Sequence, residues 1–328
     1  MTPDVQASEF TCRVCGGPSA SHFTALEMMY GTREAFDYFT CAACGCVQIA
    51  NIPDDLGRHY RDGYYSFVVA KNDRGARARK LARKVVFSGA NLPPVRSALE
   101  RHSADARLLL RYMSLLPDRN ARILDVGAGN GRIVRSLRDL GYRNALGVDA
   151  FIPSDIVDGA GLVVRRCDLS AVDGEWNLIS FNHSLEHMPD QIGTLRVARR
   201  LLAKGGQILV RVPVAEGEAW RTYGANWIQL DPPRHLFLHT QQSLRTLAEH
   251  SGLTVTDTCF DSTAYQFWGS ELVNRDVALF DPGSPRPSKS TLRKLERRAR
   301  ALNINGQGDQ VAAVMAPRLD SHPTEASA

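Results

Sequence analysis

The sequence predicts an α/β fold with a doubly wound, largely parallel sheet, preceded by a small N-terminal module. Two observations predict the sheet. Short apolar runs alternate along residues 98–318 with stretches of helical periodicity, which is the pattern of strands joined by crossover helices. The first run, residues 123–126, leads through three glycines into a helix, as in turns that bring the backbone close to a nucleotide. Two Cys-x-x-Cys pairs near the start predict the module.

The other elements of the domain follow in chain order. An amphipathic helix at residues 98–116 precedes the first strand, and a helix capped by Thr240 ends at Gly252. An insertion at residues 263–309 separates the last two strands. The remaining strands are expected at 145–149, 162–167, 176–181, 207–212, 254–260 and 310–315, and the remaining helices at 132–140 and 192–202.

Four cysteines define the N-terminal module. The spacing Cys12-x-x-Cys15 and Cys41-x-x-Cys44, with a glycine after each pair, is that of a zinc ribbon, in which four thiolates hold one tetrahedral ion. A closed four-thiolate site predicts a structural role for the Zn²⁺. The N-terminus lacks an export signal, so we expect a cytoplasmic location, where thiols stay reduced.

Two further cysteines, Cys167 and Cys259, fall on predicted strands of the α/β domain and are expected in its core.

These features divide the sequence into four parts. The parts are a zinc-binding module at 1–65, a basic helical linker at 66–97, the α/β domain at 98–318 and a disordered tail at 319–328.

Composition and charge limit the function. Hydrophobic residues make up 44% of the chain and charged residues 23%, which is ordinary for a globular protein and excludes the disordered classes. No apolar segment reaches membrane-spanning length. The net charge of the chain is +5, and its positive charge is concentrated in two segments, residues 71–84 and 286–300, each of which holds seven basic residues and one acidic residue. Such segments contact nucleic acid, lipid or an anionic nucleotide-sugar, or they are solvated helix faces; apolar residues at helical spacing favour solvated faces.

The glycine turn at residues 125–131 narrows the choice of cofactor. It reads D-x-G-x-G-x-G, so it is neither the G-x-G-x-x-G of dinucleotide folds nor a phosphate loop, which ends in Lys-Ser or Lys-Thr. It resembles the first motif of the class I S-adenosylmethionine-dependent methyltransferases. That resemblance implies a Rossmann-like sheet of seven strands that binds S-adenosylmethionine. The motif positions expected to bind it are Asp125, Gly127, Ala128, Gly129, Asn130 and Gly131.

Residues after the next strands extend this cofactor site. Asp149 ends the second strand, where a carboxylate that accepts both ribose hydroxyls is expected, and Ala150 follows it. In the family that the motif resembles, an acid after the third strand meets the adenine amine, which implies that role for Asp168, with Leu169 beside it. Asn182 ends the fourth strand at the same edge. The alternatives are that Asp149 is a solvated strand end and that Asp168 only forms a turn.

The segment after the fourth strand carries the candidate chemistry. Residues 182–190 read N-H-S-L-E-H-M-P-D and resemble the S/N-x-x-L-E-H-x-x-D segment of methyltransferases that act on small molecules. Enzymes that methylate amino groups of bases usually carry D/N-P-P-Y/F there, which this sequence lacks. His187, oriented by Glu186, is the expected general base because imidazole titrates near neutral pH, and His183 and His235 are its substitutes. Alternatively, His187 only caps or packs the next helix.

Two further features concern the acceptor. The loop at residues 227–240 is expected to close over the cleft, with Arg234 and His235 facing an anionic or hydroxylated acceptor. A zinc module followed by these motifs resembles bacterial methyltransferases of deoxysugar and surface-polysaccharide biosynthesis, in which an aromatic stretch lies near the acceptor; here that stretch holds Tyr64 and Tyr65. Alternatively, these tyrosines pack the module onto the domain.

The same resemblance implies a small-molecule acceptor, namely a nucleotide-sugar or glycan. A sugar hydroxyl is expected ahead of a keto-sugar carbon, because the sugar C-methyltransferases carry a further C-terminal domain that 328 residues do not accommodate. Two other functions stay open. A zinc ribbon joined to a methyltransferase domain also resembles ribosomal-RNA methyltransferases, whose RNA binding would weaken steeply with salt. A non-catalytic cofactor-binding scaffold would never turn over, and changes to Glu186 and His187 would have no effect.

Overall fold

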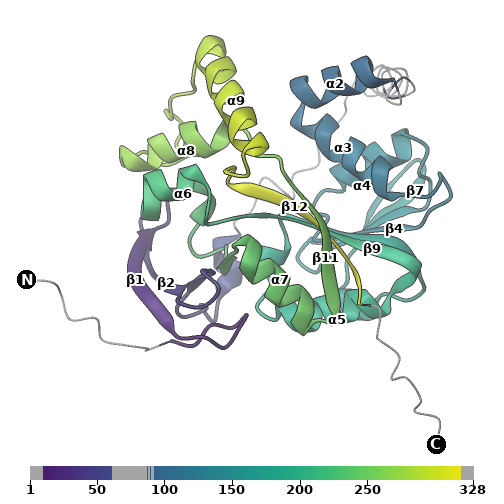
Figure 1. Cartoon of the computed structure of the whole chain (residues 1–328), viewed down its shortest axis with the longest axis horizontal. Helices are drawn as coiled ribbons and strands as arrows, with labels where there is room; N and C mark the ends of the chain where they lie inside the picture. The colour runs from purple at the N-terminus through teal and green to yellow at the C-terminus, as the bar shows by residue number, and fades with distance from the viewer. Residues whose placement is uncertain (1–9, 61–86, 88, 90–91, 319–328) are drawn as a thin grey trace, which may run out of the picture.

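A computed structural model describes residues 10–60, 87, 89 and 92–318 (Figure 1). The expectations for Tyr64 and Tyr65, for the basic segment 71–84, for most of the linker at 66–97 and for the tail at 319–328 lie outside the described residues.

Within the described residues, a mixed sheet of eight strands forms the centre of the domain. Its order is β11-β12-β9-β8-β4-β5-β7-β6, in which β9, β8, β4, β5 and β7 run parallel and β12 is antiparallel to both β9 and β11. This is the doubly wound arrangement that the alternating pattern predicts. The strands are β4 Ile123–Val126, β5 Ala145–Val148, β6 Ile156–Asp158, β7 Gly161–Arg165, β8 Trp176–Asn182, β9 Leu202–Pro213, β11 Leu253–Phe260 and β12 Gln310–Pro317.

The predicted number of seven strands is wrong by one edge strand. β6 pairs antiparallel with β7 through a tight turn, and Gly161 at the turn has a φ of 102°, which glycine adopts without strain. A strand of three residues is too short to show the two-residue periodicity from which strands are recognised. No periodic pattern therefore predicts this strand.

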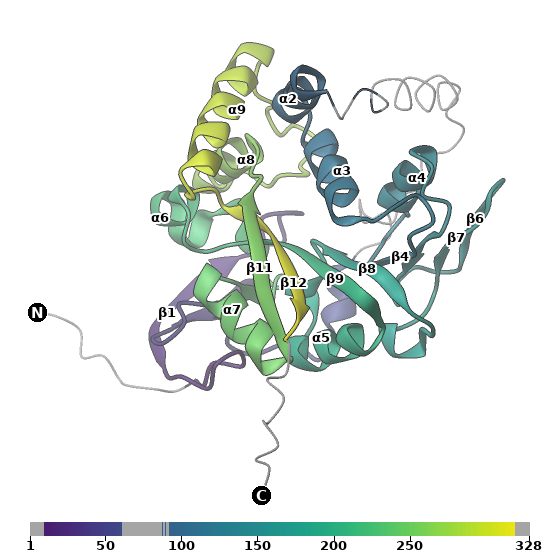
Figure 2. The ribbon, with the colours of Figure 1, turned by 45° about the vertical axis from the view of Figure 1, so that its right-hand side comes forward.

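Helices cover both faces of this sheet. Figure 2 shows α3 and α4 on one side and α5 and α7 on the other. Alternate residues of a strand point to opposite faces, so in β8 Leu178 packs with α3 and α4 while Ile179 packs with α5 and α7. The helices are α2 Pro93–His102, α3 Ala104–Leu115, α4 Arg132–Asp139, α5 Gln191–Arg200, α6 Glu218–Tyr223, α7 Gln241–His250, α8 Tyr265–Asn274 and α9 Lys289–Ile304, with short 3-10 helices η1 Leu56–His59, η2 Leu169–Ala171, η3 Leu185–His187, η4 Gly224–Asn226 and η5 Ile228–Leu230.

The single helix predicted at residues 98–116 is two helices. Ser103 has extended backbone angles, and its hydroxyl accepts a hydrogen bond from the Ala106 N–H, so that it caps the start of α3. Because α2 already begins at Pro93, it also crosses the boundary expected at residue 98. Ser103 therefore ends one helix and caps the next, because its hydroxyl satisfies a helix-start N–H. The amphipathic pattern alone does not show this break.

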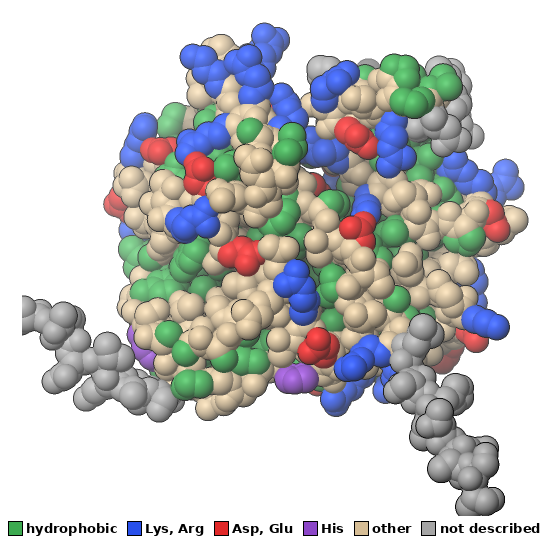
Figure 3. Space-filling view, in the orientation of Figure 1, with side chains coloured by type: hydrophobic (Ala, Val, Ile, Leu, Met, Phe, Trp, Pro, Cys, Tyr) green, Lys and Arg blue, Asp and Glu red, His purple; other side chains and the backbone are tan. Residues whose placement is uncertain are grey.

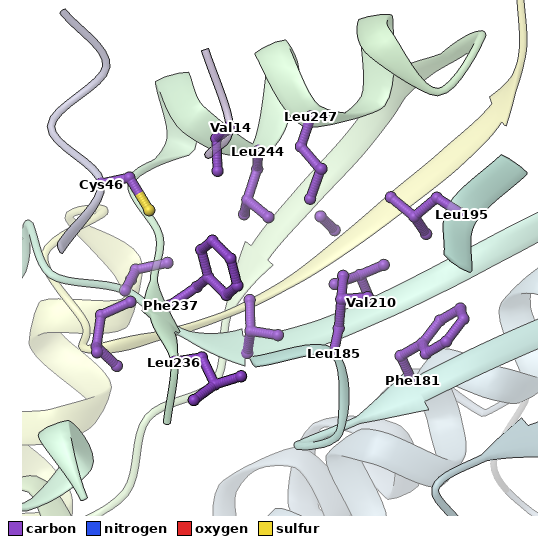
Figure 4. Packing of buried hydrophobic residues seen from close by; sticks show 14 of the residues in the cluster. Val14, Cys46, Phe181, Leu185, Leu195, Val210, Leu236, Phe237, Leu244 and Leu247 are labelled. Atoms are coloured by element: carbon purple, nitrogen blue, oxygen red, sulfur yellow. The ribbon is translucent and has the colours of Figure 1, made fainter. Parts of the chain in front are cut away.

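The N-terminal module shares its sheet and its core with the domain. Strands β1 Ser19–Leu26, β2 Ala35–Cys41 and β3 Val47–Ile49 form an antiparallel sheet whose fourth strand is β10, Phe237–Leu238, from the loop after β9. Figure 4 shows Val14 and Cys46 of the module packed beside Phe237 and Leu244 of the domain. The module therefore continues the domain core.

The insertion between β11 and β12 forms a helical cap. Its helices α8 and α9 lie beside α6, above β1 in Figure 1. On α9, Ala299 and Leu302 are buried against Phe267, whereas Lys and Arg side chains gather on its outer face (Figure 3). Arg298 of this basic segment ion-pairs with Glu218. None of the described helices is long and apolar enough to cross a membrane.

Candidate active site

A large cavity lies at the carboxyl ends of β4, β5, β7 and β8. Its volume is about 550 Å³, and we call it the main cavity. Parallel α/β sheets bind ligands at this edge, on either side of the strand where the winding reverses. Of the residues predicted for the cofactor, it is lined by Gly127, Gly129, Asp149, Ala150, Asp168 and Leu169; of those predicted for catalysis, by His183 and His187.

The glycine turn leaves no room for side chains. Gly127 has a φ of 72°, and a Cβ placed on it would lie 2.4 Å from the Ser184 Cβ. A Cβ on Gly131 would lie 2.7 Å from side-chain carbons of Val163 and Val164. The glycines are therefore required both for the turn and for its close approach to β7 and to the segment that follows β8.

Asp149 is held rigidly at the mouth of the turn. One carboxylate oxygen accepts the Gly129 N–H at 2.9 Å, and the other accepts the Phe151 N–H at 2.9 Å. Each oxygen keeps a further lone pair that can face a ligand hydroxyl. Asp168 is held less firmly, because it accepts one N–H bond, from Ser170 at 2.8 Å, which caps η2.

Two predicted cofactor residues lie behind the cavity wall. Asp125 is buried and accepts hydrogen bonds from Ser180 Oγ at 2.8 Å and from Asn182 Nδ2 at 3.0 Å. Burial raises the pKa of Asp125 to about 6, although these bonds oppose the shift. Asp125 and Asn182 thus brace β4 against β8. Ala128, Asn130 and Gly131 also lie outside the lining of the main cavity.

Sequence reasoning missed several lining residues. Phe151 follows the expected ribose carboxylate, is 72% exposed, and stacks on Tyr60 with ring centroids 6.0 Å apart and planes 10° from parallel. A large apolar side chain two residues after a strand-end acid was an available signal for it. Cys167, expected in the core, lines this cavity instead, because β7 ends at Arg165.

His187 lines the main cavity, and among the described residues its ring nitrogen Nε2 has no hydrogen-bond partner. Its Nδ1–H donates to the Arg234 carbonyl at 2.8 Å, and the Tyr60 hydroxyl oxygen lies 3.0 Å from the same nitrogen. A carbonyl can only accept, so the proton is on Nδ1 and Nε2 carries the lone pair. Burial and the nearby His235 lower the pKa of His187, which favours this neutral form.

Glu186 contacts the other histidines and not His187. It is fully buried; its Oε1 lies 3.2 Å from His183 Nδ1 and 3.9 Å from His235 Nε2. Burial opposes its charge, but the hydrogen bond and charge of His183, together with the charge of His235, lower the pKa of Glu186 to about 2. The orientation of His187 that the sequence assigned to Glu186 comes from the Arg234 carbonyl.

The two ring systems of His187 and His235 are in direct contact. They meet edge to face with centroids 4.8 Å apart, and the His235 Nδ1–H donates to the Gln229 carbonyl at 2.6 Å. Glu186, His187 and His235 each offer a ligand atom within 4.8 Å of the others. The trio therefore has the donor set to take up a proton or a metal ion.

Arg234 is structural, contrary to its predicted contact with the acceptor. Its side chain is 1% exposed and ion-pairs with Glu27 at 2.7 Å and with Asp231. It also donates to the His59 carbonyl at 3.2 Å. Although burial opposes their charge, the guanidinium lowers the pKa of both carboxyl groups. The Arg234 side chain therefore holds its loop against the N-terminal module. The backbone carbonyl of Arg234 in that loop orients His187.

The four predicted zinc ligands converge on one point. The Sγ atoms of Cys12 and Cys44 lie 3.7 Å apart, and those of Cys15 and Cys41 lie 3.4 Å apart. Tetrahedral Zn–S bonds of about 2.3 Å give sulfur separations of about 3.8 Å, and disulfides need about 2.05 Å. Backbone N–H groups of Val14 and Cys44, among others, point at these sulfurs. The geometry fits a closed zinc site.

The main cavity, its glycine turn and its strand-end carboxylate define an α/β domain that binds a nucleotide-like cofactor. A family model described as a methyltransferase domain matches residues 98–258. Residues 98–258 therefore form a methyltransferase domain, and the protein is an S-adenosylmethionine-dependent methyltransferase.

Solved structures of methyltransferases resemble parts of the fold at low identity. One from Thermotoga maritima is 16% identical, covers 71% of this chain and 99% of its own, with a TM-score of 0.43. One from Archaeoglobus fulgidus is 19% identical and covers 66% and 94%, with a TM-score of 0.42. The 1,6-didemethyltoxoflavin-N1-methyltransferase of Burkholderia thailandensis is 18% identical and covers 76% and 92%, with a TM-score of 0.38. No curated protein sequence matches the chain significantly.

The assignment of Asp149 makes a first prediction. Asp149→Ala is expected to weaken S-adenosylhomocysteine binding about 10- to 100-fold, because charge-assisted hydrogen bonds contribute about 1.5–3 kcal/mol. Calorimetric titration measures this, with the exposed Asp173→Ala as the matched control. Equal affinities of the two variants would refute the ribose role.

Proposed function

We propose that the protein transfers the methyl group of S-adenosylmethionine to a small-molecule acceptor, with a sugar hydroxyl first and a keto-sugar carbon second. The observation that carries the proposal is His187 Nε2, an imidazole lone pair in the wall of the main cavity whose proton is fixed on the opposite nitrogen. An alcohol needs such a base to become nucleophilic, whereas a neutral amine attacks through its own lone pair. The resemblance of the L-E-H segment to enzymes with small acceptors supports the same choice.

The chain's own residues then divide the work. Bound S-adenosylmethionine supplies a methyl group on a sulfonium, which is already an activated leaving group. Asp149 holds the ribose, and Phe151 stacks on the adenine. His187 Nε2 accepts the hydroxyl proton as the acceptor oxygen bonds to the methyl carbon and the carbon–sulfur bond breaks. S-adenosylhomocysteine leaves, and the proton passes from His187 to solvent. The buried carboxylate of Glu186 stabilises the added positive charge of the histidine cluster.

We further propose that the four cysteines hold Zn²⁺ as a structural ion. It does no chemistry, because all four positions are filled by thiolates. Its effect on the site is indirect. The Cys44 carbonyl accepts a hydrogen bond from the Thr240 hydroxyl at 2.6 Å, and β3 pairs with β10, which begins two residues after His235.

Labelled methyl transfer tests the acceptor class. The enzyme is incubated with methyl-labelled S-adenosylmethionine and host extract, half of it treated with nuclease. We expect label in small, anionic, nuclease-resistant products. Label that disappears with RNA would refute the small-molecule proposal and make the basic segments the functional surface.

Zinc removal makes a second prediction. Cys41→Ser is expected to abolish the single bound zinc ion and to lower the melting temperature strongly, because metal binding contributes directly to folding. Elemental analysis and calorimetry measure these effects, and Cys259→Ser, outside the cluster, serves as control. A zinc-free wild-type protein with unchanged melting in Cys41→Ser would contradict the metal site.

A further inference from the structure

A second cavity adjoins the main cavity. It has a volume of about 300 Å³ and is lined, among others, by His183, His235, Tyr265, Trp268 and Arg286. We propose that the second cavity is the acceptor site, in which a sugar-like ring stacks on the two aromatic residues and an anionic group of the acceptor reaches Arg286. This inference rests on the proposed methyl transfer and names where its acceptor binds and which chemical groups the acceptor carries.

The histidine cluster connects the two cavities. His183 lines both of them, and its backbone has a φ of 50°, which is uncommon for a residue with a side chain. His187 lines the main cavity and His235 the second, and their rings are in contact at 4.8 Å. An acceptor in the second cavity therefore meets the methyl donor at the junction of the two cavities, beside the imidazoles that include the proposed base.

The walls of the second cavity are fastened together before any ligand binds. They come from the module, from the loop after β9 and from the insertion, with Met29, Ile228, Leu272 and Leu279 forming one buried apolar cluster. The Leu279 N–H donates to the Met28 carbonyl at 2.9 Å, and the Phe280 N–H donates to the Met29 carbonyl at 3.0 Å. When a site is already ordered, ligand binding loses little free energy to the ordering of side chains and loops.

The lining fits a ring that bears hydroxyl groups. Tyr265 and Trp268 lie edge to face with centroids 5.3 Å apart and form an aromatic part of the cavity wall. The apolar C–H face of a sugar packs on such rings, while its hydroxyls meet the polar groups of His183 and His235.

The charges at the two ends of the second cavity determine which end of the acceptor points inward. Arg286 is exposed at the rim with its guanidinium 5.0 Å from the Trp268 ring centroid, and within the described part of the chain it has no ion pair. The inner end is different: it holds Asp231, already paired with Arg234, and the buried Glu186 lies behind the histidines. An anion is repelled there and attracted to Arg286, so the neutral hydroxyl end points inward to the histidines.

Kinetics of two variants test this site. The probe is the protein-free, nuclease-treated small-molecule fraction of host extract, used as acceptor with labelled S-adenosylmethionine. Arg286→Ala and Trp268→Ala are each expected to raise the apparent KM for this fraction at least about tenfold. Their affinity for S-adenosylhomocysteine should match that of the wild type. Arg293→Ala, exposed on the same basic segment, is the control and should behave as wild type.

The outcomes separate this inference from the function on which it rests. If the wild type labels the fraction and Arg286→Ala labels it with unchanged KM, the acceptor site is wrong and the methyl transfer stands. If the wild type labels nothing, the proposed function fails, and this site fails with it. If the labelled product is not retained by an anion exchanger, the proposed role of Arg286 is wrong. Loss of that retention after phosphodiesterase and phosphatase treatment identifies the anionic group as phosphate, and its persistence identifies a carboxylate.

Discussion

Arg234→Met is expected to lower the free energy of unfolding by about 3–5 kcal/mol, because it leaves buried carboxylates without their cation. Glu27 and Asp231 are 1% and 5% exposed, and each contacts the Arg234 guanidinium. Methionine preserves much of the side-chain volume, so the loss reports the charge and not a cavity. Urea unfolding measures the change.

Two further variants make this result interpretable. Arg33→Met removes an exposed ion pair with Asp276 and should cost at most about 1 kcal/mol. Combining Arg234→Met with Glu27→Gln and Asp231→Asn should recover part of the stability, because no unpaired charge then remains buried. If Arg234→Met costs no more than Arg33→Met, the buried network does not hold the module to the domain.

His187→Ala is expected to reduce kcat about 10²- to 10⁴-fold, the usual contribution of a general base, with unchanged affinity for S-adenosylhomocysteine. The comparison uses the labelled-methyl assay, and the exposed His22→Ala is the control. Wild-type kcat should fall at low pH, since only the neutral imidazole accepts a proton. Because burial lowers the pKa of His187 from 6.5, the plateau should already be reached below neutral pH.

The pH profile distinguishes a base from a packing residue. The fall of kcat at low pH, which is the acid limb of the profile, should be absent in His187→Ala. This variant has no imidazole at position 187 that could be protonated. If the variant keeps both its turnover and its acid limb, His187 only packs against η3 and the loop, and another residue removes the proton.

Features set by local sequence could be predicted, and features set by distant contacts could not. The glycine turn follows from its own short spacing and Asp149 from its place at the end of the next strand, and both reach the main cavity. Asp125 stands in the same motif, but its burial depends on Ser180 and Asn182 of a neighbouring strand. The motif alone therefore could not separate the residues that face the ligand from those behind it.

The histidine cluster shows the same limit. Its residues were recognised from one short segment and one loop, but their hydrogen-bond partners were not. Arg234 lies 207 residues from Glu27 in the chain, and no local pattern shows that its charge is neutralised inside the protein. The pairing of β3 with β10, which makes the module part of the active-site wall, also joins distant segments.

A crystal structure with S-adenosylhomocysteine tests the central claim most directly, namely that the histidine cluster lies where the methyl donor meets its acceptor. We predict ribose hydroxyls on Asp149, the adenine against Phe151, and the sulfur directed toward His187 and the second cavity. A cofactor bound in the main cavity with its sulfur directed away from the histidine cluster would contradict the account.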